Sequence, residues 1–368
     1  MFLALREMKH AKLRYGLIGL IMVLIAWLVL FVSGLAAGLA SDNAASIKHM
    51  NATHLVLQEE SDHRLTRSAL ELSALDEVQQ AVGEAESAAL GVRMSTLTKE
   101  GETKKTDATF FAVDVNGMLA PKIIEGSMIT DVTETEVVAD ASLKEEGFRL
   151  GDTIHDQATD LTYTIVGFTE GQSFSHSPVV FMNLKAWEQA QPKHGGADVG
   201  PLVQAIAMNT DNDTAAKVSA ELEGVEVITK ADAMQGIPGY KEEQGSLLMM
   251  IVFLFVIAAF VLAVFFYVIT IQKMNQFGVL KAIGAKTTYL ARNLIGQVLI
   301  LSLVSLFISI ALTYGVAYML PASMPFDLSP MLTLGCSALF LVVALLGSLL
   351  SLYRVAKIDA IEAIGRAA

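Results

Sequence analysis

Four long runs of uncharged, mostly apolar residues stand out in the pattern of this chain. They lie at 17–40, 246–271, 293–320 and 331–353, and the shortest of them has 23 residues. A helix of about 20 apolar residues crosses the roughly 30 Å hydrocarbon layer of a bilayer. The pattern therefore predicts a membrane protein with four transmembrane α-helices.

The chain between the first and second runs has a different pattern, in which short periodic segments are separated by polar turns. Alternating apolar positions predict strands, and apolar positions three or four residues apart predict helices. The expected strands are 53–58, 106–115, 136–139, 161–167, 178–182, 201–208 and 225–228, and the expected helices are 65–83, 184–191 and 215–223. This segment is expected to fold as a large α+β domain with its own core.

Together these elements divide the chain into six parts. They are a cytoplasmic N-terminal tail with the first transmembrane helix (1–40), an extracytoplasmic α+β domain (41–245), the second transmembrane helix (246–271), a cytoplasmic segment (272–292), the third and fourth transmembrane helices (293–353) and a cytoplasmic C-terminal tail (354–368). The first run is longer than the ~7–15-residue core of a signal peptide, so we expect an uncleaved helix.

Composition and charge agree with this division. Hydrophobic residues make up 53% of the chain and charged residues 17%, which excludes a soluble enzyme, a nucleic-acid-binding domain and a disordered scaffold. Acidic residues exceed basic ones by 19 within 41–245, whereas basic residues exceed acidic ones by 8 in the two tails and 272–292 together. The positive-inside rule therefore places both termini in the cytoplasm and 41–245 outside.

The sequence contains no recognisable catalytic set. The nearest match to a nucleotide-binding phosphate loop, 278–286, is one residue too long and has apolar residues where a flexible loop needs glycine. The seven histidines lack zinc-ligand spacing, so no structural metal site is expected. The single cysteine, Cys336, lies in the fourth run, so we expect no intrachain disulfide in 41–245. We expect neither enzymatic activity nor an intrinsic cofactor.

Two glycine-containing segments and one basic segment indicate contacts. Gly34 and Gly38, one helical turn apart, favour close helix–helix contact in lipid, and 236–239 is expected to join the α+β domain to the membrane. The segment 272–292 has basic residues beside an apolar face, which is typical of an amphipathic helix that binds a partner's groove, with a plain membrane anchor as the alternative.

Three stretches resemble motifs of ABC-transporter permeases of the MacB/FtsX type. Residues 136–140, 147–153 and 163–167 are similar to a strand, turn and strand in the external core of that family. Residues 272–286 resemble its cytoplasmic coupling segment, and 353–365 resemble its closing motif. The order of one span, a large external domain and three further spans is also that of the family.

The resemblance implies an ABC permease in a bacterial cell membrane whose ATP is hydrolysed by a separate ATPase subunit. It implies that the ATPase contacts Phe277, Gly278, Leu280, Lys281, Ile283 and Gly284. Residues 237–272 are more particularly similar to heme-efflux permeases of the HrtB subfamily. That similarity implies a homodimer with two ATPase copies that exports heme from the membrane, protects the cell from heme toxicity and has no nucleic-acid partner.

If heme is the transported substrate, the start of the second run carries its candidate ligands. Phenolate, thioether and carboxylate groups can bind heme iron, and the candidates are Tyr240, Glu242, Glu243, Met249 and Met250. On a helix, Tyr240, Glu243 and Met250 share one face, and Glu242 and Met249 share an adjacent one. The alternative is that the methionines pack and that Tyr240 is an interface aromatic. His49, Met50 and His54 are weaker candidates, because nothing in the sequence fixes their direction.

Two other functions remain open at this point. The chain could be a permease for another amphiphile, such as a peptide antibiotic or lipoprotein, or a mechanotransmitting subunit that moves its external domain without carrying cargo. The four runs contain almost no ionisable residues, which argues against ion-driven transport.

Overall fold

The computed structural model describes residues 12–191, 200–320 and 324–356, except for the side chains of residue 275 and residues 350–356. The closing motif expected at 353–365 therefore lies largely outside the described residues and side chains. The chain divides into two compact units: an α/β domain, Leu39–Gln244, and a helical unit made of the residues before and after it.

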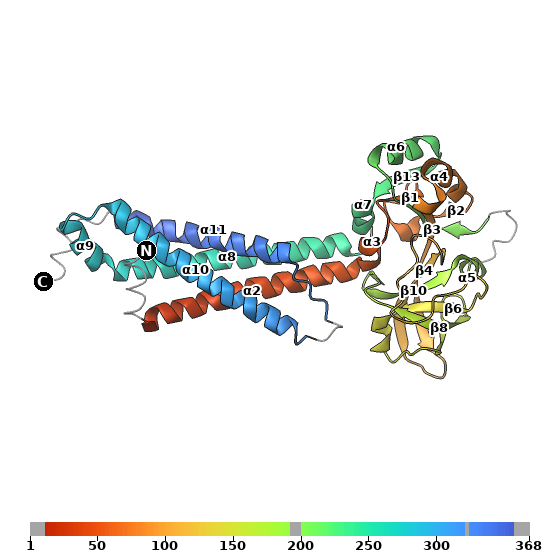
Figure 1. Cartoon of the computed structure of the whole chain (residues 1–368), viewed down its shortest axis with the longest axis horizontal. Helices are drawn as coiled ribbons and strands as arrows, with labels where there is room; N and C mark the ends of the chain where they lie inside the picture. The colour runs from red at the N-terminus through yellow and green to blue at the C-terminus, as the bar shows by residue number, and fades with distance from the viewer. Residues whose placement is uncertain (1–11, 192–199, 321–323, 357–368) are drawn as a thin grey trace. The chain divides into compact units, whose positions relative to one another are not determined.

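Among the described residues, four helices are long and apolar enough to span a membrane. They are α2 (Lys12–Asn43), α8 (Tyr240–Gln272), α10 (Thr287–Ala317) and α11 (Pro330–Ala356) (Figure 1). A helix satisfies its backbone hydrogen bonds internally, which lipid requires. The prediction of four membrane-spanning helices is therefore confirmed.

Helices α2 and α10 contact each other through small polar residues. Ser305 Oγ donates to the carbonyl of Gly19 at 3.3 Å, and Ser309 Oγ donates to the carbonyl of Val23 at 2.8 Å. Both serines are buried, and their small side chains let the two backbones approach closely. Apolar residues from all four helices complete the core, including Met22, Leu30, Leu262, Phe266, Val298 and Phe340.

The glycine pair of α2 contacts a loop, not a helix. A Cβ atom on Gly34 would lie 2.6 Å from Cζ of Phe326, and one on Gly38 would lie 2.3 Å from the backbone oxygen of Pro325. The amide of Asp327 donates to the carbonyl of Gly34 at 3.0 Å. The expected helix–helix contact is thus corrected: the missing Cβ atoms make room for the segment between α10 and α11.

In the described part of the α/β domain, an 11-stranded sheet has the main order β13-β1-β12-β3-β4-β10-β6-β8-β5, with β7 and β9 off this path, and β11 pairs with β2 separately. The strands are β1 (His54–Gln58), β2 (Leu70–Glu71), β3 (Ser87–Lys99), β4 (Lys105–Val113), β5 (Glu125–Gly126), β6 (Glu136–Asp140), β7 (Thr153–Asp156), β8 (Leu161–Thr169), β9 (Ser173–Phe174), β10 (Ser177–Asn183), β11 (Leu202–Val203), β12 (Ala205–Met208) and β13 (Val225–Thr229). The helices are α3 (Ala45–His49), η1 (Leu65–Arg67), α4 (Ala74–Val82), η2 (Glu84–Glu86), η3 (Ala141–Lys144), α5 (Leu184–Gln189), α6 (Asn212–Glu221) and α7 (Lys230–Gln235).

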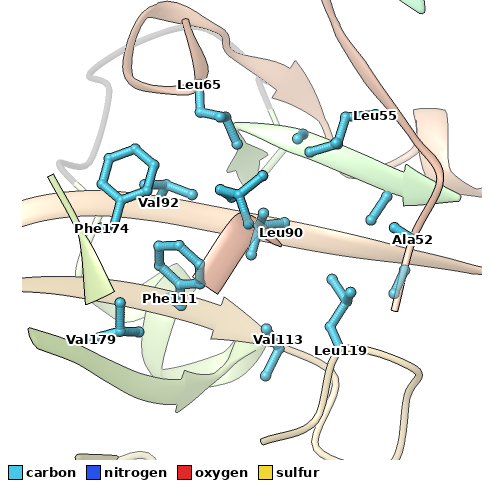
Figure 2. Packing of buried hydrophobic residues seen from close by; sticks show 14 of the residues in the cluster. Ala52, Leu55, Leu65, Leu90, Val92, Phe111, Val113, Leu119, Phe174 and Val179 are labelled. Carbon is cyan, nitrogen blue, oxygen red and sulfur yellow. The ribbon is translucent and has the colours of Figure 1, made fainter. Parts of the chain in front are cut away.

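Strand β3 connects two lobes of this domain. Its residues 87–90 pair antiparallel with β12, and its residues 91–98 pair antiparallel with β4. One lobe carries β1, β13, α4 and α6, and the other carries β6, β8 and β10 (Figure 1). Because side chains alternate along a strand, Phe111 of β4 faces the cluster of Figure 2, whereas Phe110 packs with Tyr163 in a second cluster.

The sequence prediction missed strands β3, β5, β7 and β9 and the short helices α3 and α7, and it was partly wrong at 65–83. The first half of β3 is buried without interruption, so it lacks the apolar–polar alternation that identifies a strand. Residues 65–83 form the turn η1, the short strand β2 and helix α4 rather than one helix. The other expected strands and helices are present, and their observed bounds differ from the expected ones by a few residues. The expected strand 201–208 is split into β11 and β12. The predicted fold class is confirmed.

Replacing Gly38 with alanine is expected to destabilise the helical unit. The new Cβ would overlap backbone atoms of Pro325, which cannot rotate away, and overpacking of this kind costs about 1–3 kcal/mol. Thermal unfolding of the purified chain in one detergent measures the effect. The matched control is Gly16→Ala in the same helix, where a Cβ meets nothing within 4 Å. Equal unfolding temperatures for the two variants would contradict the packing.

Candidate functional site

Three segments of the α/β domain meet at the ends of two membrane-spanning helices. They are the last residues of α2, the first turn of α8 and the tip of the β9–β10 hairpin, and all lie within Leu39–Gln244. Asn43 Nδ2 donates to Glu243 Oε2 at 2.6 Å, and the carbonyl of Asn43 accepts from the amide of Ser175 at 2.8 Å. We call Asp42, Asn43, Ser175, His176 and Glu243 the helix-end junction.

The hairpin tip of the junction has an uncommon backbone. Ser175 and His176 have φ values of 52° and 60°, the positive values that a two-residue type I′ turn requires. Most side chains disfavour this region, and such residues persist where their surroundings fix them. Contacts with Asp42, Asn43 and Glu243 supply those surroundings.

His176 bridges two carboxylates from different helices. Its Nδ1 lies 3.2 Å from Asp42 Oδ2, and its Nε2 lies 3.0 Å from Glu243 Oε2. Partial burial alone would lower the pKa of His176, but the hydrogen bonds to Glu243 and Asp42 outweigh it, so the pKa is raised above its usual value. Both ring nitrogens donate in the imidazolium form, which is therefore the form that closes the bridge.

Of the expected heme ligands, Tyr240 and Glu243 are engaged within the α/β domain. Tyr240 is half-buried and packs against the core cluster that includes Leu55 and Phe111. Glu243 binds Asn43 and His176, and its side chain is 19% exposed. The structure therefore gives these two residues positioning contacts that their spacing on the helix did not reveal.

Glu242 points into a different environment from its neighbour. It is exposed and lines a polar hollow of about 430 Å³ with Lys241, residues 235–239 and residues 62–64. The backbone oxygen of His63 would lie 1.9 Å from a Cβ on Gly236, so only glycine fits where the two walls meet. Asp62 and His63 have positive φ values, so this loop also has a constrained backbone.

The two methionines belong to the helical unit, where both are exposed. Met249 is 58% exposed and Met250 is 43% exposed. They belong to the same helix, α8, as the three other candidates. Among the described residues, no cluster of three or more His, Cys, Asp or Glu side chains could hold a metal ion.

The expected ATPase-contact segment folds as a short helix, α9 (Met274–Ala282), whose apolar residues face two ways. Phe277 is buried against Leu290 of α10 with Leu280 beside it, whereas Val279 and Ile283 are 52% and 76% exposed. Gly284 has φ 98° and ends the helix. The exposed apolar pair, rather than the whole predicted face, is therefore available to a partner.

Lys273, one of the basic residues of the segment 272–292, is buried. It is 4% exposed, its Nζ donates to Gln297 Oε1 at 2.9 Å and lies 5.5 Å from the ring centre of Tyr15. The hydroxyl of Tyr15 donates to the same oxygen of Gln297 at 3.2 Å. This cluster joins the start of α9 to α2 and α10.

Comparison with known proteins finds relatives that are similar to this chain over its whole length. Residues 248–360 match the family model "FtsX-like permease C-terminal". The chain is 32% identical over 365 residues, 99% of each chain, to "Putative hemin transport system permease protein HrtB" of Staphylococcus haemolyticus. It is 31% identical over 368 residues, again 99% of each, to the protein of that name from Staphylococcus epidermidis. Among solved structures, the periplasmic region of MacB from Actinobacillus actinomycetemcomitans is similar to this chain at 13% identity and a TM-score of 0.36. The match covers 53% of this chain and 96% of the MacB chain.

Replacing His176 with asparagine is expected to destabilise the chain at low pH and much less at high pH. A raised histidine pKa stabilises the fold below the pKa of the unfolded chain, about 6.5, and that stabilisation is lost as pH rises through the folded pKa. Asparagine tolerates positive φ, so the turn is kept. Unfolding temperatures between pH 5.5 and 9 measure the effect.

Ser175→Asn is the matched control for this experiment, because it changes the neighbouring turn residue without removing a titratable group. Its difference from wild type should not vary with pH. A His176→Asn difference that is constant across the pH range would show that the imidazolium bridge contributes nothing.

Proposed function

We propose that this chain, which belongs to the HrtB-type FtsX-like permeases, exports heme as the membrane subunit of an ABC transporter. A permease of this family is a multi-pass membrane protein and requires an ATPase partner. Heme is proposed as the cargo because the chain is similar over its whole length to relatives that are named as hemin transport permeases. In this proposal heme is the transported substrate and not a resident cofactor.

The proposed assembly is a homodimer of this chain with two copies of the ATPase. Its proposed orientation has both termini in the cytoplasm and residues 41–245 outside. The charge difference between 41–245 and the rest of the chain supports that orientation.

The proposed contacts with heme lie at the start of α8. Glu242 is exposed and supplies a carboxylate oxygen, and Met249, an exposed residue of the same helix, supplies a thioether and apolar surface. Met250 adds apolar surface, while Tyr240 and Glu243 hold the first turn in the α/β domain. Among the three exposed candidates, Glu242 is the one that supplies a charged oxygen, and this favours it as the iron ligand.

The proposed mechanism is mechanical and needs no ion gradient. ATP-driven closure of the ATPase subunits pushes on α9 through its exposed residues, and the buried contact between Phe277 and Leu290 passes that push to the bundle. Helix α8 runs without interruption from Tyr240 to Gln272, so a displacement at its cytoplasmic end reaches its first turn. Heme held there then leaves outward.

Hemin titration of the purified chain, followed at the Soret band, tests the cargo. Glu242→Gln is expected to weaken binding by tenfold or more, because it removes the charged oxygen ligand and leaves the side chain's size unchanged. Glu243→Gln is the matched control: it should lower the unfolding temperature by weakening the junction and leave hemin affinity within a factor of two or three. Tyr240→Phe should also preserve affinity.

The absence of saturable hemin binding in wild type would overturn the heme proposal and leave the permease assignment standing. A peptide antibiotic or lipoprotein cargo, or movement of the α/β domain without cargo, would then be the function to test. If only Glu243→Gln lowers the affinity for hemin, the iron ligand would be Glu243 of the helix-end junction instead of Glu242.

Replacing Ile283 with aspartate is expected to reduce stimulation of the partner ATPase by about tenfold, because a charge would enter an apolar contact. The chain itself should fold normally, since Ile283 is 76% exposed. Co-purification with the ATPase and the ATPase rate in liposomes measure the effect. Val132→Asp, at an 87% exposed position of the α/β domain, is the matched control. Equal rates for both variants would argue against contact through Ile283.

A further inference from the structure

A second pocket lies entirely within the α/β domain, between the end of α3 and the central strands. It has a volume of about 210 Å³. Its inner walls are apolar: Leu90 of β3, Phe111 and Val113 of β4, Phe181 of β10, and Leu119 (Figure 2 shows all of these but Phe181). The pocket therefore opens onto the largest apolar cluster of the domain.

His49 lies at the edge of this pocket in an orientation suited to binding a metal. Its Nδ1 lies 3.4 Å from the carbonyl oxygen of Gly171, a contact that favours the proton on Nδ1. The lone pair of Nε2 is then available, which is the usual arrangement of a metal-ligating histidine whose other nitrogen donates to a backbone carbonyl. The histidine is exposed, so a ligand can reach it.

Other side chains around the pocket suit a flat amphiphile with acidic groups. Met50, next to His49, supplies a polarisable thioether, and the exposed Lys122 supplies a cation. Ser46 lines the pocket and is 3% exposed, yet its Oγ has no hydrogen-bond partner among the described residues. This buried hydroxyl is therefore able to donate a hydrogen bond to a polar group of a ligand in the pocket.

We propose that this pocket is a second binding site for an iron porphyrin, with His49 Nε2 as the axial ligand of the iron. The apolar edge of the ring enters between Leu90, Phe111 and Leu119, and a propionate pairs with Lys122. The inference rests on the proposed export of heme and deepens it, because it gives the cargo a site in the α/β domain that is distinct from the start of α8.

The size of the pocket fits a temporary site. Pockets that enclose a ligand have volumes of about 300–1,000 Å³, so a pocket of about 210 Å³ takes one edge of the porphyrin and leaves the rest in solvent. One axial histidine and one edge contact hold the ring loosely enough for it to be released. A histidine also replaces the carboxylate of Glu242 as iron ligand, so the two sites should differ in their absorption spectra.

The experiment is a hemin titration of the full-length chain in nanodiscs, using Glu242→Gln to weaken the α8 site. In this background we expect a residual Soret change of the histidine-ligated type. Adding His49→Gln should weaken that residual binding by tenfold or more. His155→Gln, which changes another partly exposed histidine of the α/β domain, is the matched control and should have no effect.

A second variant changes the wall of the pocket and leaves His49, the proposed iron ligand, in place. Ala120→Trp places a large ring among the lining residues and should block the residual binding while His49 remains. Metal-free protoporphyrin, which cannot bind an imidazole through iron, should bind this pocket more weakly than hemin and with the same affinity in wild type and His49→Gln.

The outcomes separate the two proposals. If wild type binds no hemin, heme export itself is overturned. If wild type binds hemin and Glu242→Gln weakens it, but neither His49→Gln nor Ala120→Trp changes the residual spectrum or affinity, the pocket proposal is overturned and export stands. If His155→Gln weakens the residual binding as much as His49→Gln does, the binding is non-specific surface ligation and the proposal also fails.

Discussion

The structure depends on one constraint: a chain that crosses lipid must satisfy its backbone hydrogen bonds inside each helix. The spans therefore run as uninterrupted helices, joined within the spans by small polar side chains such as Ser305 and Ser309 and at their ends by larger polar clusters. At one end of α2 and α8, the chain uses Asn43, His176 and Glu243 to join the two helices to a hairpin. In the helical unit, Lys273 and Gln297 form the corresponding polar contact at the start of α9. Each of these two polar clusters joins several elements through few hydrogen bonds. Movement of any one of those elements therefore acts directly on the cluster.

The elements that the sequence predicted well are those with a clear period. The four spans follow from apolar length alone, and strands such as β4 and β8 follow from alternation or a short apolar run between turns. Strand β3 was missed because its first half is buried on both faces and contains Ala88, Ala89 and Gly91, which carry little strand preference. Its position is fixed by β12 and β4, which are distant in sequence, and no local pattern reports such pairing. The contact between Gly34 and Phe326 also joins residues that are distant in sequence, so no local pattern predicts it.

The candidate site shows the same limit at the level of single residues. Sequence spacing placed both Glu242 and Glu243 in the first turn of one helix, but it could not tell that Asn43 and His176 bind Glu243, nor that Glu242 is exposed. That difference comes from Asn43 and His176, which reach Glu243 from elsewhere in the chain. His176 gave no local signal, because type I′ turns favour Asn, Asp and Gly, and the pair Ser175–His176 contains none of them. Nothing in the sequence fixed the direction of His49, which depends on Gly171 in a different loop.

The two neighbouring carboxylates would couple the proposed cargo contact at Glu242 to the helix-end junction at Glu243. Consecutive residues on a helix point about 100° apart, so Glu243 can remain in the junction while Glu242 faces outward. Helix α8 contains no glycine or proline between 246 and 272, where kinks would otherwise form. The first turn of α8 lies before this stretch, and any shift of that turn that carries Glu242 also moves Glu243 against Asn43 and His176. A movement that releases the proposed cargo from Glu242 is therefore opposed by the hydrogen bonds of the junction.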